Sequence, residues 1–299
     1  MKNIYYYIIS LVLFAFAFAS CDDKVDEENS IFVDSKYEKN KFDLWLENNY
    51  SPYNIQLKYR LEDIESDFLY DVTPASYETS IAMAKFIQHL WLGVYDEVVN
   101  ADFTKMNIPK VIHFVGSPAW QSSTTVVLGT AEGGRKITLF DLDRIDLEKL
   151  DSDMFVDRYF HTMHHEFAHI LHQKKHFSKE FPKISDDSYV GNAFQDEYTE
   201  ELAHSLGFVT RYARTNYNED FVEIFSIYIT YTEAKWNALL ESITAASAKH
   251  GTQGVERLNN KLKIVKSYMK EMWKIDMDET RAVFHRRLNE IDMLDLTIK

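Results

Sequence analysis

The chain is short of cysteine and of positive charge, and each shortage excludes a class of structure or partner. Cys21 is the only cysteine among 299 residues, so no disulfide can form within the chain. Lys and Arg number 33 against 47 Asp and Glu, which gives a net charge of −14. Because a surface that binds nucleic acid phosphates needs clustered Lys and Arg, we expect no nucleic acid partner.

The remaining composition is typical of a folded protein. Hydrophobic residues make up 45% of the chain and aromatic residues 14%, which is enough apolar material for a buried core. The length suits one large domain or two ordinary ones. We find no internal repeat.

Residues 1–20 have the pattern of a signal peptide. Lys2 precedes a run from Ile4 to Ala19 that is apolar apart from Ser10. A signal-anchor helix is the alternative, but about sixteen residues are short of the ~20 that span a bilayer. Cys21 follows the small residues at the end of the run, where a lone thiol suits acylation.

The sequence Phe18-Ala-Ser-Cys21 resembles a bacterial lipoprotein box, which implies lipid on Cys21 and attachment to a membrane. The acidic residues 22–28 resemble the tether of surface-exposed lipoproteins in Bacteroidetes-type bacteria. We therefore expect a tether over residues 21–36 and a location on the surface of the outer membrane. A solvated linker is the plain interpretation of the acidic run, and both can hold.

Beyond the tether, predicted strands come first and helices follow. Residues 37–175 are expected to form an α+β part that ends in a metal-binding helix, and residues 176–299 a mainly helical part. The first part is predicted to contain, in chain order, a helix at 36–48, a strand at 55–61, a helix at 74–98, a strand at 110–115, and hairpin strands at 124–129 and 136–140. Strands that precede a helical run and do not alternate with helices indicate an α+β fold with a small mixed sheet.

The hairpin bears on function, because an exposed sheet edge beside a metal helix can pair with an extended substrate. We expect one of its strands to do so, with an ordinary edge strand as the alternative. A complex with a peptide inhibitor tests this by showing main-chain pairing or its absence.

Six histidines lie between His161 and His176. Pairs four residues apart occur at 161/165, 165/169 and 172/176, but only the pair His165 and His169 has a carboxylate, Glu166, directly after its first member. Two imidazoles one helical turn apart can bind one ion, and the glutamate between them can reach a water in the open position. This pattern predicts a zinc site with Glu166 as general base.

A catalytic zinc ion needs three protein ligands, and His165 and His169 supply two of them. The third ligand must come from elsewhere in the sequence. His172 is nearest, but His165 and His172 lie about 10 Å apart along a straight helix, too far for one ion. We expect His172 beside the ligands. Glu219 and Glu223 share a helical face downstream and are better candidates, although spacing alone does not choose between them.

The run His165-Glu-Phe-Ala-His169 and the segment from Tyr212 to Glu223 resemble the two catalytic segments of the anthrax lethal factor protease domain, a gluzincin. The resemblance implies a zincin-like fold, Glu219 as third ligand and Tyr212 as the partner of the oxyanion. It places Glu223 in a supporting role. Residues from about 140 onward also resemble a family of zinc-binding metallopeptidase lipoproteins from Bacteroidetes-type bacteria, through these segments and Ile275–Arg281.

Together these expectations describe a lipid-anchored metallopeptidase that binds one Zn²⁺ per chain and cleaves a peptide or protein substrate. His172, Asp220 and Glu223 are expected to support the ligands. Two other functions stay open. The first alternative is a non-catalytic zinc-containing surface lipoprotein that binds protein or glycan. The second is a hydrolase that acts on a non-peptide amide.

Overall fold

The computed structural model describes residues 38–61, 71–120, 126–127, 129–132, 136–195 and 199–298. The expected signal peptide, Cys21 and the tether fall on residues outside these ranges. Residues Asn40–Lys299 form one compact unit, and the account below concerns this unit alone.

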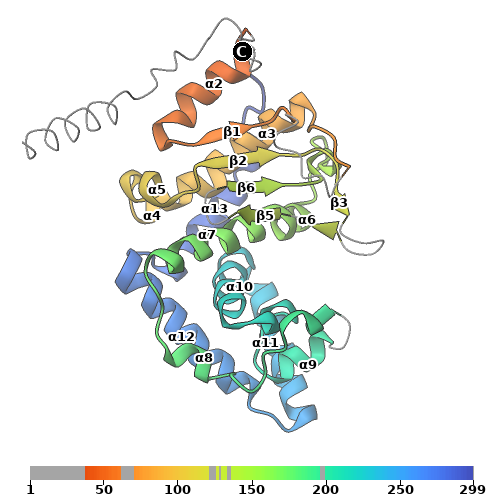
Figure 1. The fold of residues 1–299 in the computed structure, drawn as a ribbon, viewed down its shortest axis with the longest axis vertical. Helices are drawn as coiled ribbons and strands as arrows, with labels where there is room; N and C mark the ends of the chain where they lie inside the picture. The colour runs from red at the N-terminus through yellow and green to blue at the C-terminus, as the bar shows by residue number, and fades with distance from the viewer. Residues whose placement is uncertain are drawn as a thin grey trace, which may run out of the picture. The chain divides into compact units, whose positions relative to one another are not determined.

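A four-stranded sheet is the centre of the first half of this unit (Figure 1). Its strands lie in the order β1-β2-β6-β5. The first three of them are parallel, and β5 is antiparallel to β6. Their bounds are Gln56–Lys58 for β1, Val111–Phe114 for β2, Gly129–Glu132 for β5 and Lys136–Leu139 for β6. A small mixed sheet followed by helices confirms the predicted α+β class.

The predicted hairpin was wrong in its first strand. We placed that strand at 124–129, but β5 begins at Gly129 and continues into the residues assigned to the turn. Strand β4 (Val126–Val127) pairs instead with β3 (Ala119–Trp120) in a separate two-stranded sheet. The reason is that an apolar run predicts a strand without saying which partner it pairs with. Strand β5 is the edge of the larger sheet, and substrate pairing with it stays a prediction.

The helices of the first half differ in detail from the prediction. They are α2 (Lys41–Asn49), α3 (Tyr77–Ile87), α4 (Gly93–Val98) and α5 (Ala101–Asn107). The helix predicted at 74–98 is present, but a π-helical turn, Gln88–Leu92, separates α3 from α4. Ser76 caps α3 by accepting a hydrogen bond from the Thr79 amide.

Helix α7 (His161–Lys174) lies beside the edge strand β5, as Figure 1 shows. It continues α6 (Ser152–Phe155) through a second π-helical turn, Val156–Phe160. Its apolar face is buried, and the Phe167 ring packs against those of Trp91 and Tyr95 at centroid distances of 5.7 and 4.7 Å. This packing fixes the rotation of α7 about its axis.

The second half is helical, as predicted. Its helices are α8 (Glu180–Lys183), α9 (Glu200–Ser205), α10 (Tyr217–Thr230), α11 (Glu233–His250), α12 (Gly254–Trp273) and α13 (Met277–Leu288). Helix α10 packs against both α7 and α13. The stretch 174–193 contains the short helix α8. None of the helices among the described residues has the length and apolar character of a membrane span.

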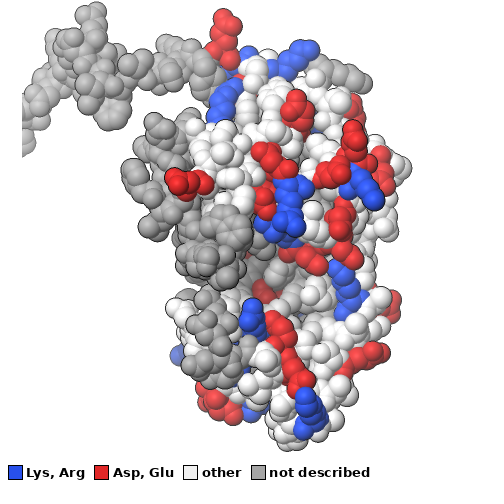
Figure 2. Space-filling view, turned by 90° about the vertical axis from the view of Figure 1, so that its right-hand side faces the viewer, with Lys and Arg blue, Asp and Glu red and all other residues white. Residues whose placement is uncertain are grey.

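Acidic and basic side chains are intermixed on the face of the molecule drawn in Figure 2. On this face, Asp and Glu side chains lie among Lys and Arg side chains and do not form a separate acidic patch. One ion pair is instead completely buried: Lys261 Nζ on α12 lies 2.8 Å from Asp220 Oδ2 on α10, and both side chains have no exposed surface. The ammonium group also donates to the Gly207 carbonyl at 3.1 Å, and Tyr189 donates to Asp220 at 2.9 Å.

Removing one partner of this pair should destabilise the fold strongly, because it leaves the other charge buried and unpaired. We expect Lys261→Met to lower the free energy of unfolding by about 3–5 kcal/mol. Lys261→Met combined with Asp220→Asn should recover at least half of this loss, since the amide can still accept from Tyr189. Denaturant unfolding monitored by circular dichroism measures both. If the single and double variants lost the same free energy of unfolding, the unpaired charge of Asp220 would not be the cause of the loss.

Candidate metal centre

Helices α7 and α10 bring the predicted ligands together. Asn216 caps α10, and its side chain accepts from the backbone amides of Asn218 and Glu219, which fixes the first turn. Glu219 and Glu223 lie one turn apart on α10, as His165 and His169 do on α7. Packing of the two helices turns both pairs toward each other.

Three ligand atoms converge at one point. His165 Nε2 lies 3.1 Å from Glu219 Oε2, and His169 Nε2 lies 3.2 Å from the same oxygen. The two Nε2 atoms are 3.2 Å apart. The three atoms therefore form a nearly equilateral triangle.

This triangle fits a tetrahedral zinc ion. With Zn–N distances of about 2.0–2.1 Å, neighbouring ligands of such an ion are about 3.3 Å apart, close to the observed separations. Two imidazoles and one carboxylate are also the ligand chemistry of a catalytic zinc site that keeps one position open. The residues present thus suit the ion in both spacing and donor type.

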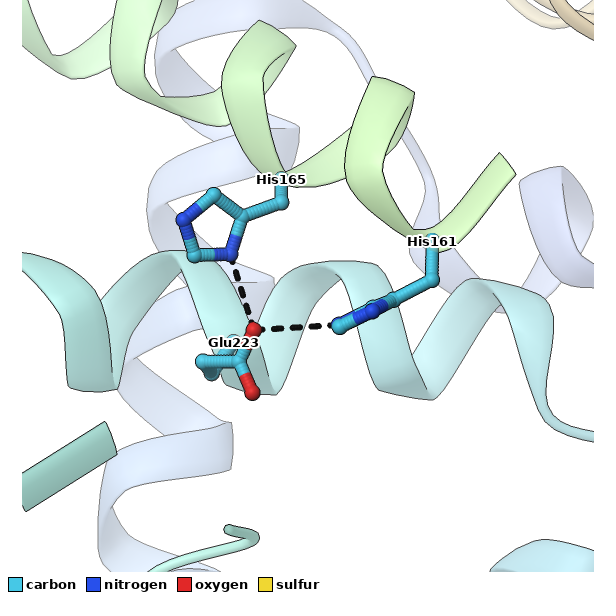
Figure 3. Close-up of side chains that lie close together, drawn as sticks. All are labelled: His161, His165 and Glu223. Carbon is cyan, nitrogen blue, oxygen red and sulfur yellow. Dashed lines mark hydrogen bonds and ion pairs between the residues drawn. The ribbon is translucent and has the colours of Figure 1, made fainter. Parts of the chain in front are cut away.

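Glu223 contacts the other nitrogen of His165, Nδ1, and Figure 3 shows this contact. His165 Nδ1 donates to Glu223 Oε1 at 2.8 Å, and this bond leaves Nε2 free to face Glu219. His161 Nε2 lies 3.0 Å from the same Glu223 oxygen. Thr210 donates to the second oxygen at 2.8 Å. Glu223 is therefore held by three side chains.

The other two expected supporting residues differ in position. His172 lies beside His169, with its Nε2 2.9 Å from His169 Nδ1, so it contacts a predicted ligand without joining the triangle. Asp220 instead accepts from Lys261 and Tyr189 in the buried cluster described above. It thus holds α10 to α12.

The electrostatics of the cluster favour a positive charge at its centre. Burial alone would lower the pKa of His165, but its hydrogen bonds with Glu219 and Glu223 outweigh burial and raise that pKa to about 10. Burial opposes ionisation of Glu219, yet the two histidines lower its pKa well below the usual range. A divalent cation bound by these atoms supplies the same compensation without protons.

Glu166 and Tyr212 lie beside the triangle. Burial raises the pKa of Glu166, and the neighbouring charges of His165 and His169 only partly oppose it. Burial, with the charge of Glu219, raises the pKa of Tyr212 well above its usual range, so the phenol keeps its proton. The Tyr212 ring lies 5.9 Å from that of His165 and is 39% exposed. One group can accept a proton and the other can donate a hydrogen bond.

His161, His165 and Glu223 form a second group of potential ligands. His165 Nδ1 donates to Glu223 Oε1 at 2.8 Å, a hydrogen bond that needs no ion, and His161 Nε2 lies at ion-pair distance, 3.0 Å, from the same oxygen. The first group is therefore the better candidate for a metal ion.

Sequence reasoning missed two supporting residues. His161 lies four residues before His165, so the sequence predicts that both lie on the same side of the helix. The sequence does not predict that His161 contacts Glu223. Thr210 carried no signal, because nothing in a sequence says that a hydroxyl two residues before Tyr212 will reach Glu223.

Comparison with known proteins agrees with this geometry. Residues 35–278 match the family described as "Putative zinc-binding metallo-peptidase". A crystal structure with the same description, from Bacteroides caccae, is similar to this chain with a TM-score of 0.76 and 43% sequence identity. The match covers 90% of this chain and 100% of that chain. No curated protein matches. With 43% identity and a family match over most of its length, the chain belongs to this family of zinc-binding metallopeptidases.

Proposed function

We propose that the chain is a lipid-anchored zinc peptidase of the gluzincin type, in which His165, His169 and Glu219 bind one zinc ion. The convergence of their three ligand atoms within 3.2 Å carries the proposal. A zinc ion bound there supplies a Lewis acid that polarises the scissile carbonyl and acidifies water.

Glu166 acts as the general base. Its carboxylate takes a proton from the attacking water and later delivers it to the leaving amine. Burial supports this role, because a raised pKa brings the carboxyl group closer to the working pH than an exposed glutamate would be.

Tyr212 stabilises the oxyanion that forms when water attacks the carbonyl. Its phenol stays protonated and can donate a hydrogen bond to that oxygen. The Phe194 ring packs edge-on against it at 5.3 Å, which limits its movement although the side chain is partly exposed. Tyr212 thus contributes mainly in the transition state and little to metal binding.

Glu166→Gln and Tyr212→Phe should therefore keep zinc and lose turnover. We expect kcat to fall about 10²- to 10⁴-fold for the first variant and about 10²- to 10³-fold for the second. Metal analysis with cleavage of an unbiased peptide library measures both quantities. Glu241→Gln and Tyr77→Phe are matched controls, since Glu241 is exposed on α11 and Tyr77 is 40% exposed at the start of α3.

If the zinc-loaded Glu166→Gln variant cleaved peptides at the parental rate, the role of Glu166 as general base would be contradicted. One zinc per chain without cleavage of any peptide by the parent would favour the binding lipoprotein instead.

Glu223→Gln should weaken zinc binding without abolishing it. The amide is a poorer acceptor for His165 Nδ1–H and lacks the negative charge of the carboxylate, so we expect an affinity loss of about 10- to 100-fold. Competition with a chelator of known affinity measures this change, with Glu241→Gln as the control. An unchanged affinity would show that Glu223 does not orient His165. Loss as complete as that caused by Glu219→Gln would indicate direct ligation by Glu223.

Lipid on Cys21 is proposed to attach the enzyme to the outer membrane. We expect the full chain to sediment with membranes when it is produced in a bacterium that processes lipoproteins, and Cys21→Ser to remove the lipid. Mass spectrometry of the mature N-terminus gives the result. An unmodified Cys21 in the exported parent chain would contradict lipidation.

A further inference from the structure

A cavity of about 740 Å³ opens directly beside the proposed metal centre. Its walls come from the end of α7, the segment 176–179 that follows it, and the first turn of α10. His169 and Glu219, two of the proposed ligands, are part of the wall. A peptide with its carbonyl at the metal centre would therefore place a neighbouring residue in this cavity.

Lys179 is the one Lys or Arg among the residues that line the cavity. Four lysines lie between residues 174 and 183, and three have partners. These are Lys174, Lys175 and Lys183, which donate to Asn107 Oδ1, to the Met272 carbonyl and to Glu180 at 3.0, 2.8 and 2.6 Å. Among the described residues, Lys179 Nζ has neither a hydrogen-bond nor an ion-pair partner.

Among the described residues, no carboxylate that lines the cavity pairs with Lys179. Glu219 is the only acidic residue on its wall, and it is directed at His165 and His169. Gln173 and Asn218 add side-chain amides to the wall. Lys179 is exposed at this wall, so its ammonium group and the amide N–H groups are available to a ligand that carries a carboxylate.

The apolar part of the wall suits the stem of such a ligand. The Phe177 ring stacks on that of Phe221 at 4.1 Å with an interplanar angle of 3°, so it is held in place by the core. Tyr217 is 44% exposed and offers a second ring surface. An acidic side chain can lay its methylene groups on these rings while its carboxylate reaches Lys179.

We propose that this cavity is the subsite for the substrate residue next to the scissile bond and that Lys179 selects a carboxylate there. The inference rests on the proposed peptidase function and adds a substrate preference to it. The carboxylate belongs either to an Asp or Glu side chain or to the terminus of a peptide, because both present the same chemistry to the ammonium group.

The test uses the zinc-loaded chain and amidated peptides that differ at the residue flanking the cleavage site, which is Glu, Gln or Lys. We expect kcat/KM to be about 5-fold higher for Glu than for Gln, the size of an exposed charge pair. Lys179→Glu should reverse the order in favour of Lys, with unchanged zinc content. Lys183→Glu, four residues further on and outside this cavity, should keep the parental order.

A second measurement does not depend on turnover. It uses short peptide hydroxamates, whose hydroxamate group binds zinc. Two compounds, with Glu or Gln next to the hydroxamate, are compared by their dissociation constants. The Glu compound should bind about 5-fold tighter to the parent and more weakly to Lys179→Glu. A matched compound without Glu but with a free terminal carboxylate separates the two sources of the charge, and a preference for it would assign the subsite to a chain end.

Equal binding of the Glu and Gln compounds by the parent, with no gain from a terminal carboxylate, would overturn the subsite. The subsite would also be overturned if the Lys179→Glu variant kept the parental preference for the Glu compound. Selective hydroxamate binding by a chain that cleaves no peptide would leave the subsite standing and remove the peptidase function, so the two failures are distinguishable.

Discussion

The contact between His165 on α7 and two carboxylates on α10 is the interaction on which the centre depends. Glu223 accepts from one nitrogen of the imidazole at 2.8 Å, and Glu219 faces the other at 3.1 Å. Burying two carboxylates is costly unless positive charge compensates for them. A cluster of mostly buried ionisable groups beside a cavity is typical of a functional site.

The rest of the structure holds the two helices in the alignment that this contact needs. Phe167 fixes the rotation of α7 against Trp91 and Tyr95, and the buried pair of Asp220 with Lys261 fixes α10 against α12. Because Asp220 directly follows Glu219, one residue faces the proposed metal centre and the next anchors the helix. The open side of the centre adjoins the cavity next to Lys179.

The sequence predicted the α+β class and named the residues that the structure brings together at the centre, because helical periodicity and the His-Glu spacing are local properties. Choosing Glu219 over Glu223 required the resemblance to a known family, since both share one helical face. The partner of β4, the helix α8 and the contact of Thr210 with Glu223 could not be predicted. Each depends on which distant segment packs alongside, and local patterns carry no such information.

The most direct test of the account is a crystal structure of the zinc-soaked chain with anomalous scattering measured at the zinc edge. We expect one peak, about 2.0–2.2 Å from His165 Nε2, His169 Nε2 and a Glu219 oxygen. A peak among His161, His165 Nδ1 and Glu223 would contradict the assignment of the ligands. The absence of any peak would contradict the metal centre itself.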